Sequence, residues 1–175
     1  AMRGVAARYP AFDEALQRPV TLSERLNHYR TPPLATPFAP DSDALLGLEA
    51  YVALQSRGMP IAPPADPRLQ AFRERGQRLY ERRIGQLDLA CAQCHDNHAG
   101  QRLGGSTIPQ AHPTGYPLYR LEWQGMASLQ RRLRSCLSGV RAEPYAYGAI
   151  ELVELELYLK GRAAGMALDA PAVRP

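Results

Sequence analysis

The sequence has no cysteine before Cys91, only one lysine, and no block of five charges of the same sign. Because basic and acidic residues alternate along the chain, we expect no nucleic-acid-binding stripe. There is also no apolar run near 18 residues, so no membrane span is predicted. The start lacks the basic and apolar segments of a secretion signal. If the protein is exported, we expect that its signal has already been removed.

The chain has 175 residues and a mass of 19.3 kDa, which suits one domain, or one domain with a smaller companion. Its 21 basic residues comprise Lys160 and 20 arginines. This excess fits either a general compositional bias or a choice of side chains that bind oxyanions through two hydrogen bonds. Of the 16 prolines, ten precede residue 68, so the front third is expected to be rich in loops.

The pattern Cys91-x-x-Cys94-His95 is typical of covalent haem attachment. The two thiols add to the vinyl groups of haem, and the adjacent histidine binds the iron as the proximal ligand. A thioredoxin-like redox pair should follow a strand in a βαβ unit, and no strand pattern precedes Cys91. A zinc site needs a second pair of ligands, and no second C-x-x-C exists. We therefore expect one covalent haem c.

Cys136 remains once the haem has taken the other two cysteines. An odd cysteine in an exported protein indicates a reactive thiol or an intermolecular bond, whereas a free cysteine often packs as a small apolar side chain. The residues alone leave both possibilities open. Haem c is normally attached outside the bacterial cytoplasm, so we expect a periplasmic protein.

Helical periodicity dominates the chain, and no convincing β alternation or repeat occurs. We expect an all-α protein, with a reduced, loop-rich helical segment over residues 1–60 and a class I cytochrome c-like domain over 61–175. The prolines of 60–66 mark the boundary between them. Helices are predicted over 6–16, 21–29, about 45–54, 67–80, 126–136 and 147–160.

The helix predicted over 67–80 carries Gly76 on its apolar face. In class I cytochromes c the first and last helices of the domain cross near the haem. A glycine permits close approach, so we expect the crossing at Gly76, with Leu157 or Tyr158 as its partner. The alternative is that Gly76 is only a tolerated helical glycine.

The sixth ligand of the haem iron has several candidates. Electron carriers usually use a methionine, and a plain periplasmic electron carrier with Met126 as the sixth ligand is the competing hypothesis. His28 lies outside the predicted haem domain, and Cys136 comes shortly before the last helix, where a distal ligand is expected. Further candidates are Met59, Met166, His98 and His112.

Arg132 lies four residues before Cys136, so the two share one face of a helix. Nearby guanidinium groups favour the thiolate form of a cysteine, which is the nucleophilic and metal-binding form. The same groups bind a small dianion through charge-assisted hydrogen bonds. The alternative is an amphipathic helix with a basic solvated face, to which we assign Arg131 and Arg134.

Five stretches resemble SoxA, the catalytic cytochrome subunit of bacterial thiosulfate oxidation. They are residues 56–61 (SRGMPI), 89–96 (LACAQCHD), 109–117 (PQAHPTGYP), 134–143 (RSCLSGVRAE) and 170–174 (APAVR). The resemblance is close over 56–175 and loose over 1–55. It is specific because several unrelated loop motifs agree in order.

The resemblance implies an L-cysteine S-thiosulfotransferase that forms a heterodimer with a small haem subunit, SoxX. Together they would couple thiosulfate oxidatively to the carrier cysteine of SoxY, in SoxYZ, and pass the electrons through haem c. The family's active cysteine, a distal haem ligand modified to a persulfide, maps onto Cys136. Its active-site arginine maps onto Arg132 and its proximal histidine onto His95.

The front of the chain departs from the family pattern. Most members carry a longer N-terminal region with a second haem or a cysteine pair, whereas Tyr29 stands where we would expect a cysteine. We therefore expect either a form with one haem and a reduced front region, or a chain whose true start is missing.

Overall fold

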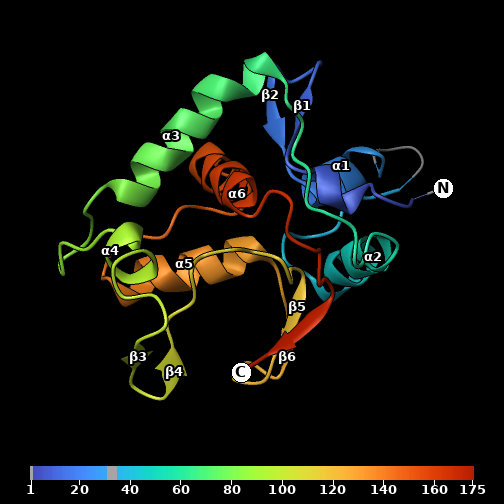
Figure 1. The fold of residues 1–175 in the computed structure, drawn as a ribbon. Helices are drawn as coiled ribbons and strands as arrows, with labels where there is room; N and C mark the ends of the chain where they lie inside the picture. Colours follow the sequence, from blue (N-terminus) through green and yellow to red (C-terminus); the bar gives the residue numbers. More distant parts are fainter. Residues whose placement is uncertain (1, 31–34) are drawn as a thin grey trace.

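The computed structural model describes residues 2–30 and 35–175 (Figure 1). The chain begins with a 3-10 turn, η1 (Ala6–Arg8), and a hairpin of β1 (Ala11–Asp13) and β2 (Arg18–Val20). The prediction of a helix over 6–16 is therefore wrong. Pro10 lies inside that stretch and cannot donate a helical hydrogen bond. The Asp13 carboxylate accepts two backbone N–H groups of the hairpin turn, which stabilises the turn in place of a helix.

Two predicted helices follow the hairpin. The first, α1 (Leu22–His28), starts with a capping box. The Thr21 hydroxyl accepts from the backbone N–H of Glu24 at 3.1 Å, and the Glu24 carboxylate accepts from that of Thr21 at 2.8 Å. The second, α2 (Asp43–Leu54), is capped by the Ser42 hydroxyl. Both confirm the prediction from the sequence.

One of the remaining helices contains the C-x-x-C-H motif, and the other three precede or follow it in the chain. A 3-10 turn capped by Asp66, η2 (Pro67–Leu69), leads directly into the first of them. No helix within the described ranges has both the length and the apolar composition needed to cross a bilayer. The four helices are α3 (Gln70–Glu81), α4 (Cys91–His95), α5 (Leu129–Gly139) and α6 (Ile150–Arg162).

Five further strands are short, and they were not predicted because two or three residues cannot show an alternation. The helix predicted over 126–136 begins only at Leu129, since the Ser128 side chain caps α5. Met126 instead lies on a strand, where it pairs with Tyr119. The strands are β3 (Arg102–Leu103) with β4 (Ser106–Thr107), and β5 (Leu118–Arg120) between antiparallel β6 (Gly125–Ala127) and parallel β7 (Ala172–Arg174).

The crossing of α3 and α6 occurs at Gly76, as predicted (Figure 1). A Cβ atom at this position would overlap the carbonyl oxygen of Glu154 and lie 3.0 Å from the Cβ atom of Tyr158. Beside the crossing, the Arg75 Nε donates to the buried Glu154 carboxylate at 2.6 Å. Because α4 contacts α3 and α5 contacts α6, the crossing of α3 and α6 fixes the positions of the two helices that carry the three cysteines.

The front of the chain and its C-terminal tail share one hydrophobic cluster. Backbone hydrogen bonds reinforce this cluster. The N–H of Ile61 donates to the carbonyl oxygen of Met166 at 2.9 Å, and the N–H of Leu168 donates to the carbonyl oxygen of Met59 at 2.8 Å. The division at residues 60 and 61 stays a prediction, and the cluster contains residues from both sides of it. Its buried members are Ala6, Leu22, Val52, Ala53, Ile61, Ala163, Leu168 and Ala170.

Candidate functional site

The single turn of α4 presents Cys91, Cys94 and His95, all half-buried. The turn begins where the backbone N–H of Ala90 donates to the Gln93 side chain at 2.8 Å. Both thiols are free, and both project from the same turn as the histidine. The structure thus brings together the three residues that the motif predicted for haem attachment.

The surroundings of Cys91 are apolar. Its thiol packs against a cluster built around the buried side chains of Tyr80, Leu155 and Leu159. Burial raises the pKa of Cys91 to about 11, and the nearby Cys136 thiol acts in the same direction. The cysteine of α5 therefore lies close to the motif of α4, although the two are far apart in the sequence.

The imidazole of His95 is oriented by the backbone. Its Nδ1 lies 2.7 Å from the carbonyl oxygen of Pro109. A carbonyl oxygen only accepts hydrogen bonds, so Nδ1 carries the proton and Nε2 keeps its lone pair for a metal. Two thiols on one helical turn, one of them against an apolar cluster, and an oriented imidazole form the donor set that haem c requires, so the residues present fit that group.

A polar network that no sequence pattern indicated holds the end of α4. The buried Tyr80 hydroxyl donates to the Asp96 carboxylate at 2.8 Å, and the Arg162 Nη2 donates to the same oxygen at 2.6 Å. Burial raises the pKa of Tyr80, and Asp96 acts in the same direction. The network ties α3 and α6 to the residue after His95, and no motif announces it because its Asp96 and Arg162 are 66 positions apart.

Arg132 differs from the other arginines of α5. The Arg131 guanidinium stacks on Trp123 at 4.7 Å and lies 3.7 Å from the Asp41 carboxylate. Arg134 stacks on Tyr147 at 4.6 Å. Within the part of the chain that the structure describes, the guanidinium of Arg132 has no hydrogen-bond or ion-pair partner. It is half-buried on the same helix as Cys136, so it is available to an anion beside that sulfur.

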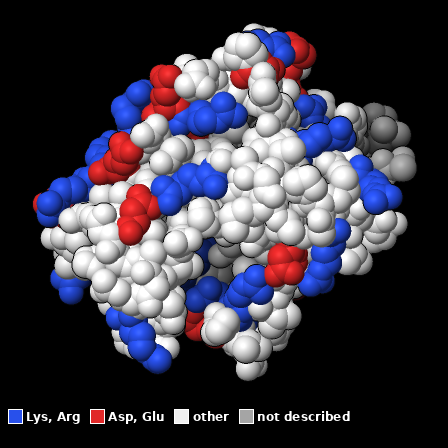
Figure 2. Space-filling model, viewed as in Figure 1, with Lys and Arg blue, Asp and Glu red and all other residues white. Residues whose placement is uncertain are grey.

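Tyr116 is a further residue of this region. Burial raises the pKa of its hydroxyl, while Arg132 and Arg120 act to lower it and Cys136 acts to raise it. Tyr116 therefore lies among the basic side chains near Cys136, and its place in the 109–117 motif is the one sequence signal that could have found it. Figure 2 shows a hollow near the lower centre of the face drawn, with basic side chains at its rim.

The other candidate ligands lie apart in the fold. Met166 is 40% exposed, and the Met59 side chain packs beside Gly4. The exposed His98 bonds to Gln101 at 3.2 Å. His28 lies against Tyr29 at the end of α1, and His112 is half-buried in the loop after the motif. Met126 is on β6, not on the helix assumed by the competing hypothesis.

Comparison with known proteins agrees with the sequence resemblance. A family model described as the SoxA/TsdA cytochrome c domain matches residues 1–61 and 75–168. The L-cysteine S-thiosulfotransferase subunits SoxA of Pseudaminobacter salicylatoxidans and Rhodovulum sulfidophilum are 35% and 34% identical to the chain. Each alignment covers 99% of this chain and 61% of the relative, so the chain spans about three fifths of the length of these proteins.

The fold is also similar to a solved structure. The crystal structure of SoxXA from P. pantotrophus contains a chain that matches with a TM-score of 0.94 and 30% sequence identity. The match covers 99% of this chain and 66% of that chain. It confirms the predicted cytochrome c fold.

Proposed function

The chain belongs to the SoxA/TsdA cytochrome c domain family, and we propose that it is the catalytic cytochrome subunit of an L-cysteine S-thiosulfotransferase. The observation that carries this proposal is the pair formed by Arg132 and Cys136. One is an arginine without a protein partner among the described residues, and the other is a thiol near the haem-attachment motif. A plain electron carrier has no need for either.

In this proposal Cys91 and Cys94 would hold one covalent haem c, and His95 and a persulfide on Cys136 would bind its iron. The haem, when bound, supplies a one-electron acceptor. The protein's own residues orient the ligands and exclude water. Pro109 orients the imidazole, the apolar wall around Tyr80 excludes water from Cys91, and α5 holds the sulfur of Cys136 beside Arg132.

Arg132 is proposed to bind thiosulfate. Its planar guanidinium matches two oxygens of a sulfonate group through parallel hydrogen bonds. The sulfane sulfur of thiosulfate then forms a bond with the sulfur of the carrier cysteine. That thiol loses its proton, and two electrons leave one at a time to the SoxX partner and the acceptor beyond it, so the product is a thiosulfonate (S–S–SO3) on the carrier cysteine. In this proposal the sulfur on Cys136 mediates this coupling.

The partners follow from the same family. We propose that the chain works as a heterodimer with SoxX, to which the electrons pass, and that SoxYZ is its protein substrate. The similarity to a chain of a SoxXA complex supports the first partner. A haem c attached outside the cytoplasm and the relatives named as SoxA subunits support a periplasmic location.

The mass of the Cys136 peptide tests the proposal directly. Trypsin cleaves after Arg134 and Arg141, which releases residues 135–141 as one short peptide with Cys136 as its sole cysteine. We expect the mass of one extra sulfur on this peptide in the holoprotein, and its loss after treatment with a thiol reductant. An unmodified peptide from fresh holoprotein, together with a normal methionine–iron charge-transfer band, would identify a plain carrier instead.

A further inference from the structure

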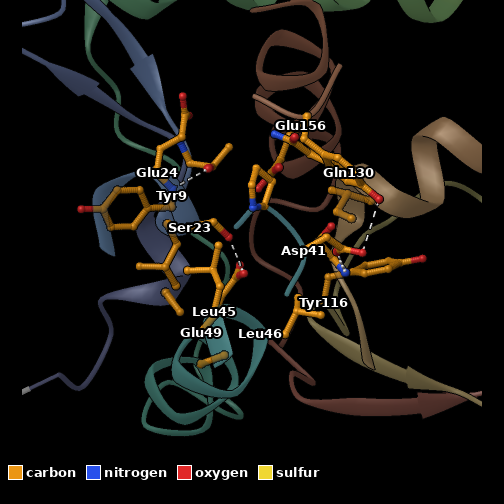
Figure 3. A pocket seen from close by; sticks show the side chains of 18 of the residues that line it. Tyr9, Ser23, Glu24, Asp41, Leu45, Leu46, Glu49, Tyr116, Gln130 and Glu156 are labelled. Carbon is orange, nitrogen blue, oxygen red and sulfur yellow. Dashed lines mark hydrogen bonds between the residues drawn. The ribbon is translucent and has the colours of Figure 1, made fainter. Parts of the chain in front are cut away.

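The only lysine of the chain is buried. Lys160 lies in the last turn of α6, is 6% exposed, and lines a cavity of about 110 Å³ together with residues of α1 and α2. In this cavity the Ser23 hydroxyl donates to the Glu49 carboxylate at 2.5 Å, and Glu156 enters from α6 (Figure 3). A buried ammonium group is costly unless its N–H donors are used, so the contacts of Lys160 are informative.

The Lys160 ammonium donates a hydrogen bond to the carbonyl oxygen of Pro113 at 2.9 Å. Pro113 belongs to the segment over residues 109–117, which contains no helix or strand and is called here the 109–117 loop. Three of its nine residues are prolines. Proline has no backbone N–H, so this loop is held largely through its carbonyl oxygens.

Other hydrogen bonds to the 109–117 loop also come from α6 and from the chain after it. The Arg162 Nη2 donates to the carbonyl of Gln110 at 3.3 Å. The backbone N–H of Asp169 donates to the carbonyl oxygen of Thr114 at 2.8 Å, and that of Ala172 donates to the carbonyl oxygen of Gly115 at 3.2 Å. The Lys160 bond is buried and holds the middle of the loop, whereas the Arg162 bond is exposed.

The start of the 109–117 loop supplies the carbonyl that orients His95, at 2.7 Å from Nδ1. A histidine that donates from one ring nitrogen has a fixed tautomer and a more basic second nitrogen, and such outer partners tune the metal that the histidine binds. The strength of this hydrogen bond depends on where the Pro109 carbonyl lies. That position depends in turn on the groups that fasten the loop.

We propose that Lys160 is a positioning residue for the proximal histidine. By holding Pro113, it keeps the 109–117 loop where the Pro109 carbonyl orients His95, and it thereby helps to set the reduction potential of the haem. The inference rests on haem attachment at the motif, which the cytochrome c family supports, and is independent of the thiosulfate chemistry. It also gives a role to the one position at which this arginine-rich chain uses lysine.

The test is a redox titration of the holoprotein carrying Lys160→Met, which removes the donor and keeps an unbranched apolar side chain. A weaker hydrogen bond at Nδ1 makes the imidazole a poorer donor to oxidised iron, so the potential should rise. We expect the equilibrium constant for reduction to increase about tenfold, which equals about 59 mV for one electron. Loss of a positive charge by itself would lower the potential, so the sign of the change separates the two causes.

Three further variants complete the test. Lys160→Arg keeps the charge and the donor and should retain the wild-type potential. Arg73→Met is the matched control, because it also removes a positive charge, and the Arg73 Nη2 donates to the carbonyl of Pro64, in another proline-rich loop, at 3.5 Å. Its potential should not rise. If Lys160→Met does not retain haem, Lys160→Leu removes the same donor with another apolar side chain of similar volume.

An unchanged or lower potential in Lys160→Met, or in Lys160→Leu where that variant replaces it, would overturn the proposal. So would an equal rise in Arg73→Met, because loosening any loop would then have the same effect. None of these measurements uses thiosulfate or SoxYZ. A failure here, with a persulfide still found on Cys136, would therefore overturn the role of Lys160 and leave the proposed activity in place.

Discussion

Replacing Gly76 by alanine tests the helix crossing that frames the haem-attachment motif. The new Cβ would lie 2.6 Å from the carbonyl carbon of Glu154 and would overlap its oxygen. This obstacle is backbone, which cannot rotate away as a side chain can, so α3 and α6 must move apart. Overpacking of this kind costs about 1–3 kcal/mol, and we expect the upper half of that range.

Alanine also gains helix propensity over glycine, worth about 1 kcal/mol. The net loss expected for Gly76→Ala is therefore about 1–2 kcal/mol, which lowers Tm by about 2–8 °C for a chain of this size. The assay is thermal unfolding of the holoprotein followed by circular dichroism, with haem content measured in parallel. Denaturant unfolding gives a second value for the same loss of free energy.

Gly47→Ala is the matched control. Gly47 also lies inside a helix, α2, but nothing is within 4 Å of the position that a Cβ would occupy. Only the gain in propensity applies there, so Tm should rise by about 2–4 °C. A Gly76→Ala protein as stable as wild type, beside a stabilised Gly47→Ala protein, would refute the close crossing.

Three other substitutions test the site and the cavity. Arg132→Lys should lower thiosulfate-dependent modification of SoxYZ by about two to four orders of magnitude, since two charge-assisted hydrogen bonds of roughly 1.5–3 kcal/mol each are lost. Wild-type turnover would contradict this prediction. So would a large loss of haem or a large fall in Tm that the control variant Arg131→Lys does not share. Cys136→Ser should raise the reduction potential, because sulfur-anion ligation stabilises oxidised iron; an unchanged spectrum and potential would exclude Cys136 as a ligand. Burial raises the pKa of Glu156 to about 8 from 4.5, so its neutral form stabilises the fold at low pH and this stability is lost as pH rises toward 8. Glu156→Gln should flatten that loss in urea unfolding at a series of pH values, and an identical pH dependence in both proteins would refute the raised pKa of Glu156.

The parts of the fold that were predicted correctly have local causes. The capping box at Thr21 and the serine cap at Ser42 act within three residues, so the sequence shows them directly. The spacing of Cys91, Cys94 and His95 is equally local. Gly76 was identified because a glycine on the apolar face of a helix lets a second backbone approach closely, and the contact with Glu154 confirms that approach.

The errors arise where a local pattern has two solutions. The apolar spacing that continues from Met126 into α5 fits a helix, but the Ser128 cap separates strand from helix within that stretch. Glu156 and Lys160, four residues apart, resemble an exposed ion pair, and only tertiary packing places them in a cavity. Hydrogen bonds to carbonyl oxygens, such as that of Pro109 with His95, have no sequence signature because every residue has a carbonyl.

The cluster shared by the two ends of the chain has a consequence for the order of folding. Ala6 and Leu22 are buried against Leu168 and Ala170, and the backbone of residues 58–61 is bonded to that of 165–168. During synthesis, the front segment therefore has no complete core until nearly all of the chain described here has emerged from the ribosome. Contacts of such long sequence separation make folding slow. The apolar surface of the front segment stays exposed throughout this interval, and the nascent chain is prone to aggregate unless a chaperone covers it.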